Sequence, residues 1–142
     1  MMKEEANKSP REVLEFMLAR DQFTRWLGLQ VDKIDLGYCK LHYTVKEEML
    51  NGFSFIHGGV LFSAADSAFA FACNSHGRIT VALDVTITFT RPARVGEVLT
   101  VEAQELYLGN KTGVYDIRTV NEKGELVAFF KGTAYRTSKE VG

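Results

Sequence analysis

The first apolar residues of the chain recur at helical spacing. Ser9 offers a helix cap and Pro10 occupies a favoured first helical position, so a helix is expected from about Pro10 to Leu27. Gly28 is expected to end it. The polar residues 1–9 are expected to be disordered, and residues 138–142 to form a tail. The apolar stripe of this helix consists of Val13, Leu14, Met17, Leu18, Trp26 and Leu27.

Two short strand patterns and a long apolar segment follow. Residues 29–34 and 38–45 are typical of strands, and the three residues between them are enough for a hairpin. A loop is expected at 47–59, because Asn51-Gly52 and Gly58-Gly59 interrupt it. The segment 60–75 then predicts a helix that is apolar on nearly all sides and is therefore buried.

The second half of the chain alternates at period two, as strands do. In the run 80–89 one face is expected to be apolar, while Asp84 and its polar neighbours face solvent. Three more strands are expected at 98–108, 111–120 and 126–137. The apolar face of the long strand consists of Val81, Leu83, Val85, Ile87 and Phe89.

This order of elements predicts an α+β fold. A helix that is apolar on every side needs a sheet that bends around it, so we expect a long central helix wrapped by a curved antiparallel sheet of about six strands, with an N-terminal helix. One sheet still leaves a face of the central helix uncovered. That face is expected to meet its copy across a twofold axis, which predicts a homodimer.

Composition narrows the class of protein. The length of 142 residues is the common size of one domain, and residues 1–142 are interpreted as such. A formal net charge of -1 gives no electrostatic footprint for nucleic acid. The longest apolar run, 60–73, is shorter than the ~20 residues that a bilayer needs, so no membrane partner is expected. Cys39 and Cys73 lack disulfide-framework spacing and no signal-peptide pattern precedes them, which indicates a cytoplasmic protein.

Asp66 is the unusual residue of the buried helix. An unpaired carboxylate in an apolar environment is costly, so some other interaction must offset that cost. One interpretation is a structural acid that is hydrogen-bonded to a backbone or hydroxyl neighbour such as Ser63 or Ser67. The other is a general base or nucleophile that faces a cleft.

The start of the same helix favours the functional interpretation. His57-Gly58-Gly59 places two residues without side chains where free N–H groups gather at the positive end of a helix dipole. A substrate oxygen can approach such amides closely, as an oxyanion hole for acyl transfer requires. Glycine pairs also make ordinary tight turns, so this signal alone is weak.

The spacing of Gly58 and Asp66 adds a constraint. Eight residues of helix separate them by about 12 Å, so they cannot both touch one carbonyl group within a chain. Two such helices packed antiparallel across a twofold axis would bring Asp66 of one chain near Gly58 of the other. The catalytic hypothesis and the uncovered helix face thus predict the same dimer, with two equivalent sites.

Three segments carry a resemblance to a known family. Residues 51–77, 111–121 and 127–136 read NGFSFIHGGVLFSAADSAFAFACNSHG, KTGVYDIRTVN and VAFFKGTAYR. They resemble the PaaI-type hotdog thioesterases of phenylacetate catabolism, over about residues 21–137. The resemblance implies a hotdog fold, homodimers assembled into a homotetramer, and hydrolysis of phenylacetyl- or hydroxyphenylacetyl-CoA. Coenzyme A is then part of the substrate, and no cofactor is expected.

By position, the resemblance also assigns roles to individual residues. It implies that Asp66 is the catalytic acid, that the Gly58 amide polarises the carbonyl group, and that Asn51 contributes a polar side chain above the site. His57 matches the motif histidine, although we expect it chiefly to fix the helix start. Asn51 before Gly52 is equally good turn chemistry. Ala82 stands where some relatives in the wider hotdog group hold the attacking water with a serine or threonine, which leaves water positioning open.

Substrate contacts are expected from two regions. The acyl group is expected near Gly59, Leu50, Phe53 and Leu61, with Phe55 and Phe62 as further candidates. The coenzyme A phosphates need basic residues or backbone amides. Lys111-Thr112-Gly113 is the preferred contact because the resemblance places it near the pantetheine. The other basic candidates are Arg91, Arg94, Arg118, Lys131 and Arg136.

Other functions stay open at this point. His42 and His76 have no ligand-like spacing, so no metal site is expected. A hotdog hydratase or dehydratase is one alternative, in which a histidine pairs with a helix carboxylate. A non-catalytic acyl-CoA-binding module is another, and for it Asp66 would be dispensable. An assay of thiol release from a panel of CoA thioesters separates these possibilities.

Overall fold

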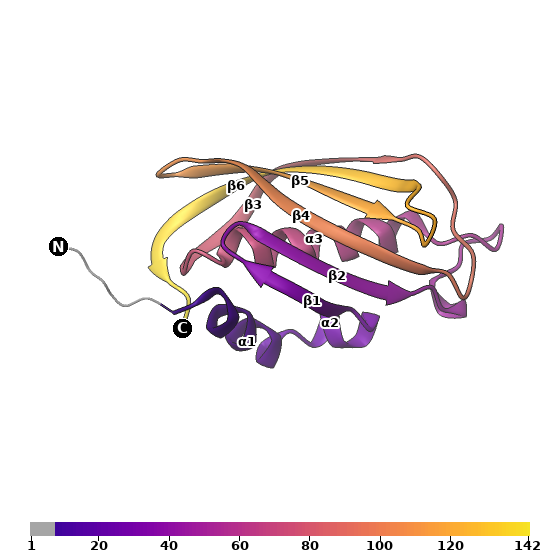
Figure 1. Ribbon diagram of the computed structural model, residues 1–142, viewed down its shortest axis with the longest axis horizontal. Helices are drawn as coiled ribbons and strands as arrows, with labels where there is room; N and C mark the ends of the chain where they lie inside the picture. Colours follow the sequence, from indigo (N-terminus) through magenta and orange to yellow (C-terminus); the bar gives the residue numbers. More distant parts are fainter. Residues whose placement is uncertain (1–7) are drawn as a thin grey trace.

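In the part of the chain that the structure describes, residues 8–142, a curved antiparallel sheet of six strands wraps around one long helix (Figure 1). This computed structural model has the order α1 (Pro10–Arg20), α2 (Gln22–Leu27), β1 (Gln30–Asp35), β2 (Tyr38–Thr44), η1 (Glu47–Met49), α3 (Gly58–Asn74), β3 (Arg78–Phe89), β4 (Val98–Leu108), β5 (Thr112–Val120) and β6 (Leu126–Glu140). Along the sheet the strands lie in the order β1-β2-β4-β5-β6-β3. The expected α+β hotdog architecture is confirmed.

The N-terminal helical region is two helices, where the sequence suggested one. Asp21 leaves the helical conformation (φ −98°, ψ 86°), and its Oδ1 accepts a hydrogen bond from the Thr24 amide at 2.9 Å. Asp21 thus begins a new helix as its cap instead of continuing the first. The restart places Trp26, expected on the apolar stripe, 74% exposed. Gly28 ends α2 with φ 79°, as the sequence predicted.

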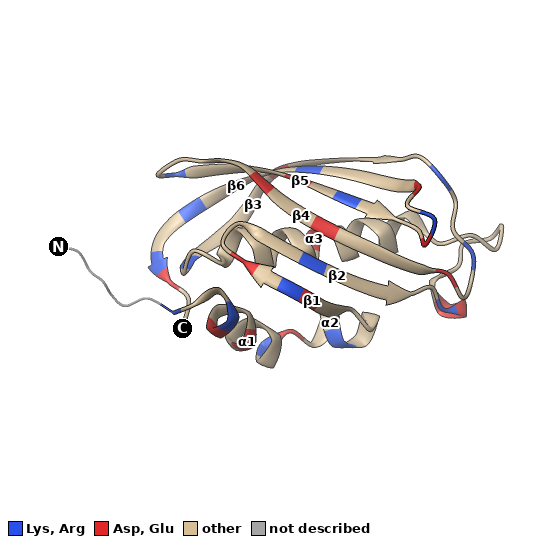
Figure 2. Ribbon diagram, in the orientation of Figure 1, with Lys and Arg blue, Asp and Glu red and all other residues tan. Residues whose placement is uncertain are grey.

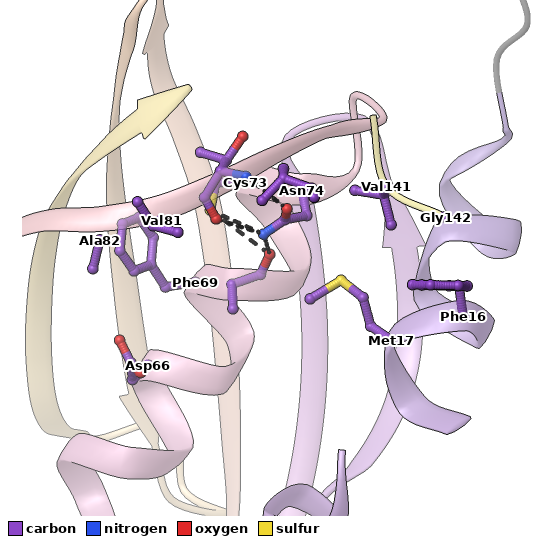
Figure 3. A pocket seen from close by; sticks show the side chains of 13 residues that line it. Phe16, Met17, Asp66, Phe69, Cys73, Asn74, Val81, Ala82, Val141 and Gly142 are labelled. Carbon is purple, nitrogen blue, oxygen red and sulfur yellow. Dashed lines mark hydrogen bonds between the residues drawn. The ribbon is translucent and has the colours of Figure 1, made fainter. Parts of the chain in front are cut away.

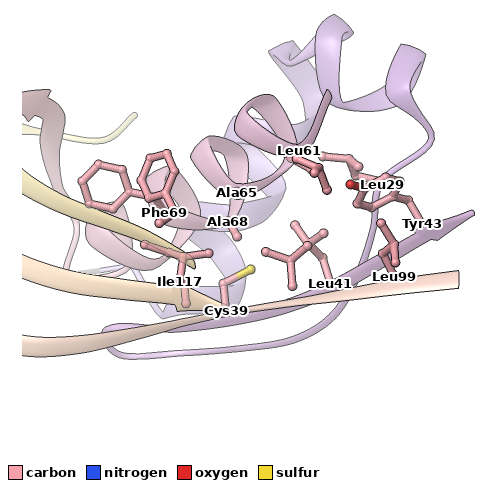
Figure 4. Close-up of a cluster of buried hydrophobic side chains, with 14 of the residues drawn as sticks. Leu29, Cys39, Leu41, Tyr43, Leu61, Ala65, Ala68, Phe69, Leu99 and Ile117 are labelled. Carbon is pink, nitrogen blue, oxygen red and sulfur yellow. The ribbon is translucent and has the colours of Figure 1, made fainter. Parts of the chain in front are cut away.

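The core lies between α3 and the concave face of the sheet. Side chains of β2, β4 and β5 point toward α3 and surround its small residues Ala65 and Ala68 (Figure 4). Both alanines are fully buried, which lets the strands approach the helix closely. Phe69 packs edge to face on Tyr115, with ring centroids 5.6 Å apart, and anchors the middle of the helix. The opposite side of α3, with Phe62 and Asp66, is only partly covered.

β3 does not keep one apolar face along its whole length. The register with β6 pairs Ala82 with Ala134 and Asp84 with Thr133, so Leu83 is an extra residue in a bulge. The bulge exchanges the two faces of the strand. The expectation that Val81 and Leu83 share the inner face with the later apolar residues is therefore wrong, and these two side chains are 50% and 61% exposed. Ala82 pairs with the buried Ala134 but is itself exposed at the sheet edge.

The two ends of the described chain lie close together. Of residues 1–9, expected to be disordered, residues 1–7 lie outside the described part, while Ser9 accepts a hydrogen bond from the Glu12 amide and caps α1. The expected tail at 138–142 is wrong. β6 continues to Glu140, which pairs with Arg78, and Val141 is buried with its amide bonded to the Gly77 carbonyl at 2.8 Å. The end of β6 thereby approaches α1 (Figure 1).

Charged side chains occur on most helices and strands of this fold. In Figure 2, acidic and basic positions are spread over helices and strands, with acidic positions on β4 and mainly basic positions on β6. The basic positions of residues 8–142 thus lie on several elements, unlike the clustered basic surface that binds a phosphate backbone. Within residues 8–142, no helix has the length and apolar character needed to cross a membrane.

Candidate active site

The start of α3 presents one free backbone amide. His57 is the helix cap, and its Nδ1 accepts a hydrogen bond from the Gly59 amide at 2.8 Å. Val60 and Leu61 both donate to the His57 carbonyl. Within the described residues no acceptor is found for the Gly58 N–H, so this group can donate to a substrate oxygen at the positive end of the helix.

The geometry at these residues explains the glycine pair. A Cβ on Gly58 would lie 3.1 Å from the Phe89 ring, so any side chain there would have to displace that ring or the helix start. Gly59 packs against the His57 imidazole, and its amide is used by the cap. Because His57 Nδ1 is an acceptor here, the histidine fixes the helix start. The Gly59 amide is not free for a substrate, although this residue was predicted to bind one.

Asn51 holds the loop in front of the helix. Its Oδ1 accepts hydrogen bonds from the amides of Phe53 at 2.8 Å and Phe55 at 3.1 Å, and this turn holds Ser54 at φ 66°. The side-chain acceptor of Asn51 is therefore occupied by the turn. Its Nδ2 has no acceptor among residues 8–142 and is a second free donor near the Gly58 amide.

Asp66 has no hydrogen-bond donor in the described chain. Ser67 approaches the Thr24 hydroxyl at 3.4 Å instead, and neither Ser63 nor Ser67 bonds to the carboxylate. Within residues 8–142, the serine hydrogen bond that the structural interpretation offered is thus not formed. Burial raises the pKa of the Asp66 carboxyl above its usual value. A half-buried, unpaired carboxylate of this kind is available to accept a proton or to attack a carbonyl carbon.

The Gly58 amide and the Asp66 carboxylate open onto different hollows of the same chain. The hollow at the helix start, here called the Gly58 hollow, has a volume of about 400 Å³ and contains Asn51 and Gly58. The second, here called the Asp66 hollow, has a volume of about 410 Å³ and lies between α3, β3, α1 and the end of the chain (Figure 3). Within one chain the free Gly58 amide and the Asp66 carboxylate therefore open onto separate hollows, as the spacing of about 12 Å predicts.

Two residues of the Asp66 hollow lie where a hydroxyl group could hydrogen-bond a water molecule. Ala82, which faces the hollow from β3, has only a methyl group. The Thr80 hydroxyl also lies at the hollow, but it donates to the Arg78 carbonyl at 2.9 Å. Within residues 8–142, neither Ala82 nor Thr80 thus offers a free hydroxyl to this hollow.

Some of the predicted acyl-binding residues line a hollow and others do not. Leu61 and Phe55 line the Gly58 hollow. Phe53 is 82% exposed and lines neither hollow, and Leu50 pairs with Ile56 in an isolated bridge. The described chain thus does not bring Phe53 or Leu50 to either hollow.

Lys111-Thr112-Gly113 lies in the hairpin between β4 and β5, apart from both hollows of its own chain. The Thr112 carbonyl accepts from the Gly109 amide, and the Lys111 carbonyl accepts from the Arg136 amide, each at 2.7 Å. Gly113 pairs with Ala134 in the sheet. The backbone of the hairpin is largely committed, and its contact with coenzyme A stays a prediction.

Arginines gather instead beside the Gly58 hollow. Arg91 lines that hollow and also a polar hollow of about 430 Å³ that contains Arg94 and Lys123. Arg94 stacks on Phe55, with its guanidinium carbon 4.9 Å from the ring centroid. Arg91 is paired with Glu125 at 3.3 Å, which offsets part of its charge.

The two other histidines each pair with a carboxylate. His42 Nδ1 lies 2.8 Å from Asp32, and His76 Nε2 lies 2.7 Å from Glu105. Among residues 8–142, no group of three His, Cys, Asp or Glu side chains is arranged to hold a metal ion.

Sequence reasoning missed much of the lining of the Asp66 hollow. Phe16 and Met17 reach it from α1, and Val141 from the supposed tail. No local pattern singled these residues out. Met17 was placed on the apolar stripe of the first helix, but the surface that this stripe meets depends on how α1 docks.

Comparisons with known proteins place the chain in a family. Residues 53–128 match the family model of the Thioesterase superfamily. The chain is 45% identical to the acyl-coenzyme A thioesterase PaaI of Escherichia coli K12 over 120 residues, which cover 84% of this chain and 86% of that protein. The solved structure of the E. coli PaaI protein from the phenylacetic acid degradation operon has a TM-score of 0.92 and 41% identity, and covers 94% of this chain and 96% of that one.

A further solved structure contains a ligand. It is a hypothetical thioesterase from Streptococcus pneumoniae TIGR4 with coenzyme A, similar at a TM-score of 0.76 and 25% identity over 79% of this chain and 90% of that chain. The family match at 53–128 includes Gly58, Asp66 and Ala82. It does not include Asn51 or any part of α1.

Proposed function

This chain belongs to the thioesterase superfamily and is a thioester hydrolase, and on that premise we propose that it cleaves phenylacetyl-CoA and ring-hydroxylated relatives to the free acid and coenzyme A. The observation that carries the proposal is a free amide at Gly58 and an unpaired carboxylate at Asp66 on the same helix. The E. coli relative is an acyl-CoA thioesterase from a phenylacetic acid degradation operon, which supports the aryl-acetyl group.

A second copy of the chain completes the site in this proposal. β3 stands at the edge of the sheet, is twelve residues long, and exposes apolar side chains at Ile79, Val81 and Leu83. Such an edge favours pairing with another strand. Antiparallel pairing with the copy would cover the open side of α3 and bring Asp66 to the partner's Gly58. By the resemblance, two such dimers would form a homotetramer.

The chemistry follows from the two groups. The thioester oxygen accepts hydrogen bonds from the Gly58 amide and from Asn51 Nδ2. In a water route, Asp66 takes a proton from a water molecule while the water oxygen bonds to the carbonyl carbon. Asp66 then returns the proton to the thiolate when the C–S bond breaks. In a direct route, an Asp66 oxygen attacks and expels the thiolate, and water then hydrolyses the mixed anhydride. The absence of a hydroxyl at Ala82 is compatible with either route.

The arginines beside the Gly58 hollow suit the charged end of coenzyme A. Arg91 and Arg94 offer guanidinium groups next to the hollow that would receive the thioester oxygen. Arginine matches phosphate geometry well. A phosphate would also compete with Glu125 for Arg91.

We also propose a cytoplasmic location. Cys39 and Cys73 are free and buried, which suits a reducing compartment.

Thiol release from a panel of CoA thioesters tests the function. Phenylacetyl-CoA and hydroxyphenylacetyl-CoA are expected to have the highest kcat/KM, and Asp66→Asn to abolish release. The matched control Asp84→Asn removes a carboxylate from the exposed face of β3 and should leave turnover intact. If no thioester is hydrolysed, the reaction is wrong. If long straight-chain acyl-CoAs are hydrolysed with much higher kcat/KM than the aryl-acetyl thioesters, the aryl-acetyl assignment is wrong although the reaction class stands.

A further inference from the structure

The Asp66 hollow is longer than an aryl-acetyl group requires. Its side on α3 runs from Asp66 to Asn74, which is about 12 Å at the rise of a helix. With bond lengths near 1.5 Å, a phenylacetyl group extends only about 6 Å from its carbonyl carbon to the far ring carbon. A ring joined to a thioester at Asp66 therefore ends near Ala70, and about half of the hollow remains beyond it.

The lining beyond Ala70 suits hydrocarbon. Asn74 is a polar side chain there, but its amide is already used. Its Nδ2 donates to the carbonyls of Ala70 at 2.9 Å and Thr80 at 3.0 Å, and its Oδ1 accepts from the Thr80 amide at 2.9 Å. Apart from Asp66, no Asp, Glu, Lys or Arg side chain of the described residues lines the hollow. An apolar acyl chain fits this space, whereas a charged one would be left unpaired.

The far end of the hollow is lined by α1 and by residues 141–142. We call this the end wall, formed by Phe16, Met17 and Val141. Figure 3 shows Met17 extending from α1 toward α3 near Asn74, and Asp66 lies further along the helix on the same hollow. Val13 and Leu14 anchor α1, since each is only 1% exposed. The end wall is therefore fixed by helix docking and does not depend on the active-site loop.

We propose that the acyl chain lies along α3 in the Asp66 hollow and that the end wall sets the greatest chain length that the enzyme accepts. This rests on the proposed function, since it takes Asp66 as the point of cleavage. An extended chain advances about 1.2 Å per bond, so 12 Å holds an acyl chain of about eight to ten carbons. The end wall lies outside residues 53–128, so the length limit is set outside the part matched to the family.

The kcat/KM of straight-chain acyl-CoA thioesters of increasing length tests this proposal. In the wild type it should rise about fourfold per methylene up to about eight to ten carbons and then fall. Met17→Ala removes the three side-chain atoms beyond Cβ and should move the limit about three carbons higher. Met17→Trp should lower the value for octanoyl-CoA about tenfold or more. Phenylacetyl-CoA should change less than about twofold in both, because its ring ends before the wall.

Leu18→Ala is the matched control, because Leu18 lies on the same helix, packs against the core and does not line the hollow. It should leave the length limit unchanged. If Met17→Trp does not fold, Phe16→Ala replaces it and should lengthen the limit. A limit that stays the same in folded variants of the end wall overturns this inference while the thioesterase function stands. A wild type that cleaves no acyl-CoA overturns the function itself.

Discussion

Mixed dimers give the sharpest test of a site shared between two chains. One parent carries Asp66→Asn and keeps its Gly58 amide. The other carries Gly58→Val, whose side chain would meet the Phe89 ring at about 3.1 Å and obstruct the amide. Each parent dimer has two damaged sites, and each should lose about 100-fold or more in kcat. A mixed dimer has one site with both substitutions and one site with neither.

The expected recovery follows from counting. After full exchange of equal amounts, half of the dimers are mixed and each has one intact site of two, so the mixture should reach about a quarter of wild-type activity. Thiol release measures turnover, and native mass spectrometry confirms the exchange. If mixed dimers are present but activity does not exceed that of the parents, Gly58 and Asp66 do not act across an interface.

A double variant supplies the control. Chains with both Asp66→Asn and Gly58→Val, mixed with the wild type, form mixed dimers in which each site has one damaged group. Exchange should therefore reduce wild-type activity by about half. Wild-type activity that is unaffected by exchange would indicate that each chain has its own complete site.

Three further predictions concern stability, assembly and the thiols. Burial raises the pKa of the Asp66 carboxyl, so the folded protein binds the carboxyl proton more tightly than the unfolded chain does. Its contribution to folding stability is therefore lost as the pH rises from about 4, the unfolded pKa, through the raised folded pKa. Asp66→Asn should therefore be more stable than the wild type in urea at pH 7 but not at pH 3, and a lower stability at pH 7 would favour a structural role. Leu83→Glu places a charge on the exposed edge strand, so light scattering should show monomers and these should have no thioesterase activity. The control Leu106→Glu, at a similarly exposed position on β4, should stay dimeric. Burial raises the pKa of Cys39 and Cys73 to about 12, so the native protein should resist iodoacetamide at pH 8, and rapid labelling would contradict the buried thiols.

The sequence by itself determined the elements whose signals are local. The 98–108 strand was predicted within its observed bounds, because its residues are typical of strands and turn residues flank it. Gly28 was predicted as a helix end because a positive φ at that position needs no distant contact. The free Gly58 amide likewise follows from any helix start, since its first N–H groups lack partners within the helix.

Tertiary structure decided what depends on pairing between distant segments. The β3 bulge at Leu83 exists because β6 pairs with β3 on both sides of it, and it exchanges the faces that alternation assigned to Val81 and Leu83. Val141 is buried because Gly77 accepts its amide, although the preceding residues look like a polar tail. Met17 forms an end wall only because α1 docks beside α3. Hydrophobic periodicity shows that a residue is buried, but the partner it is buried against is fixed by contacts between segments that are distant in the sequence.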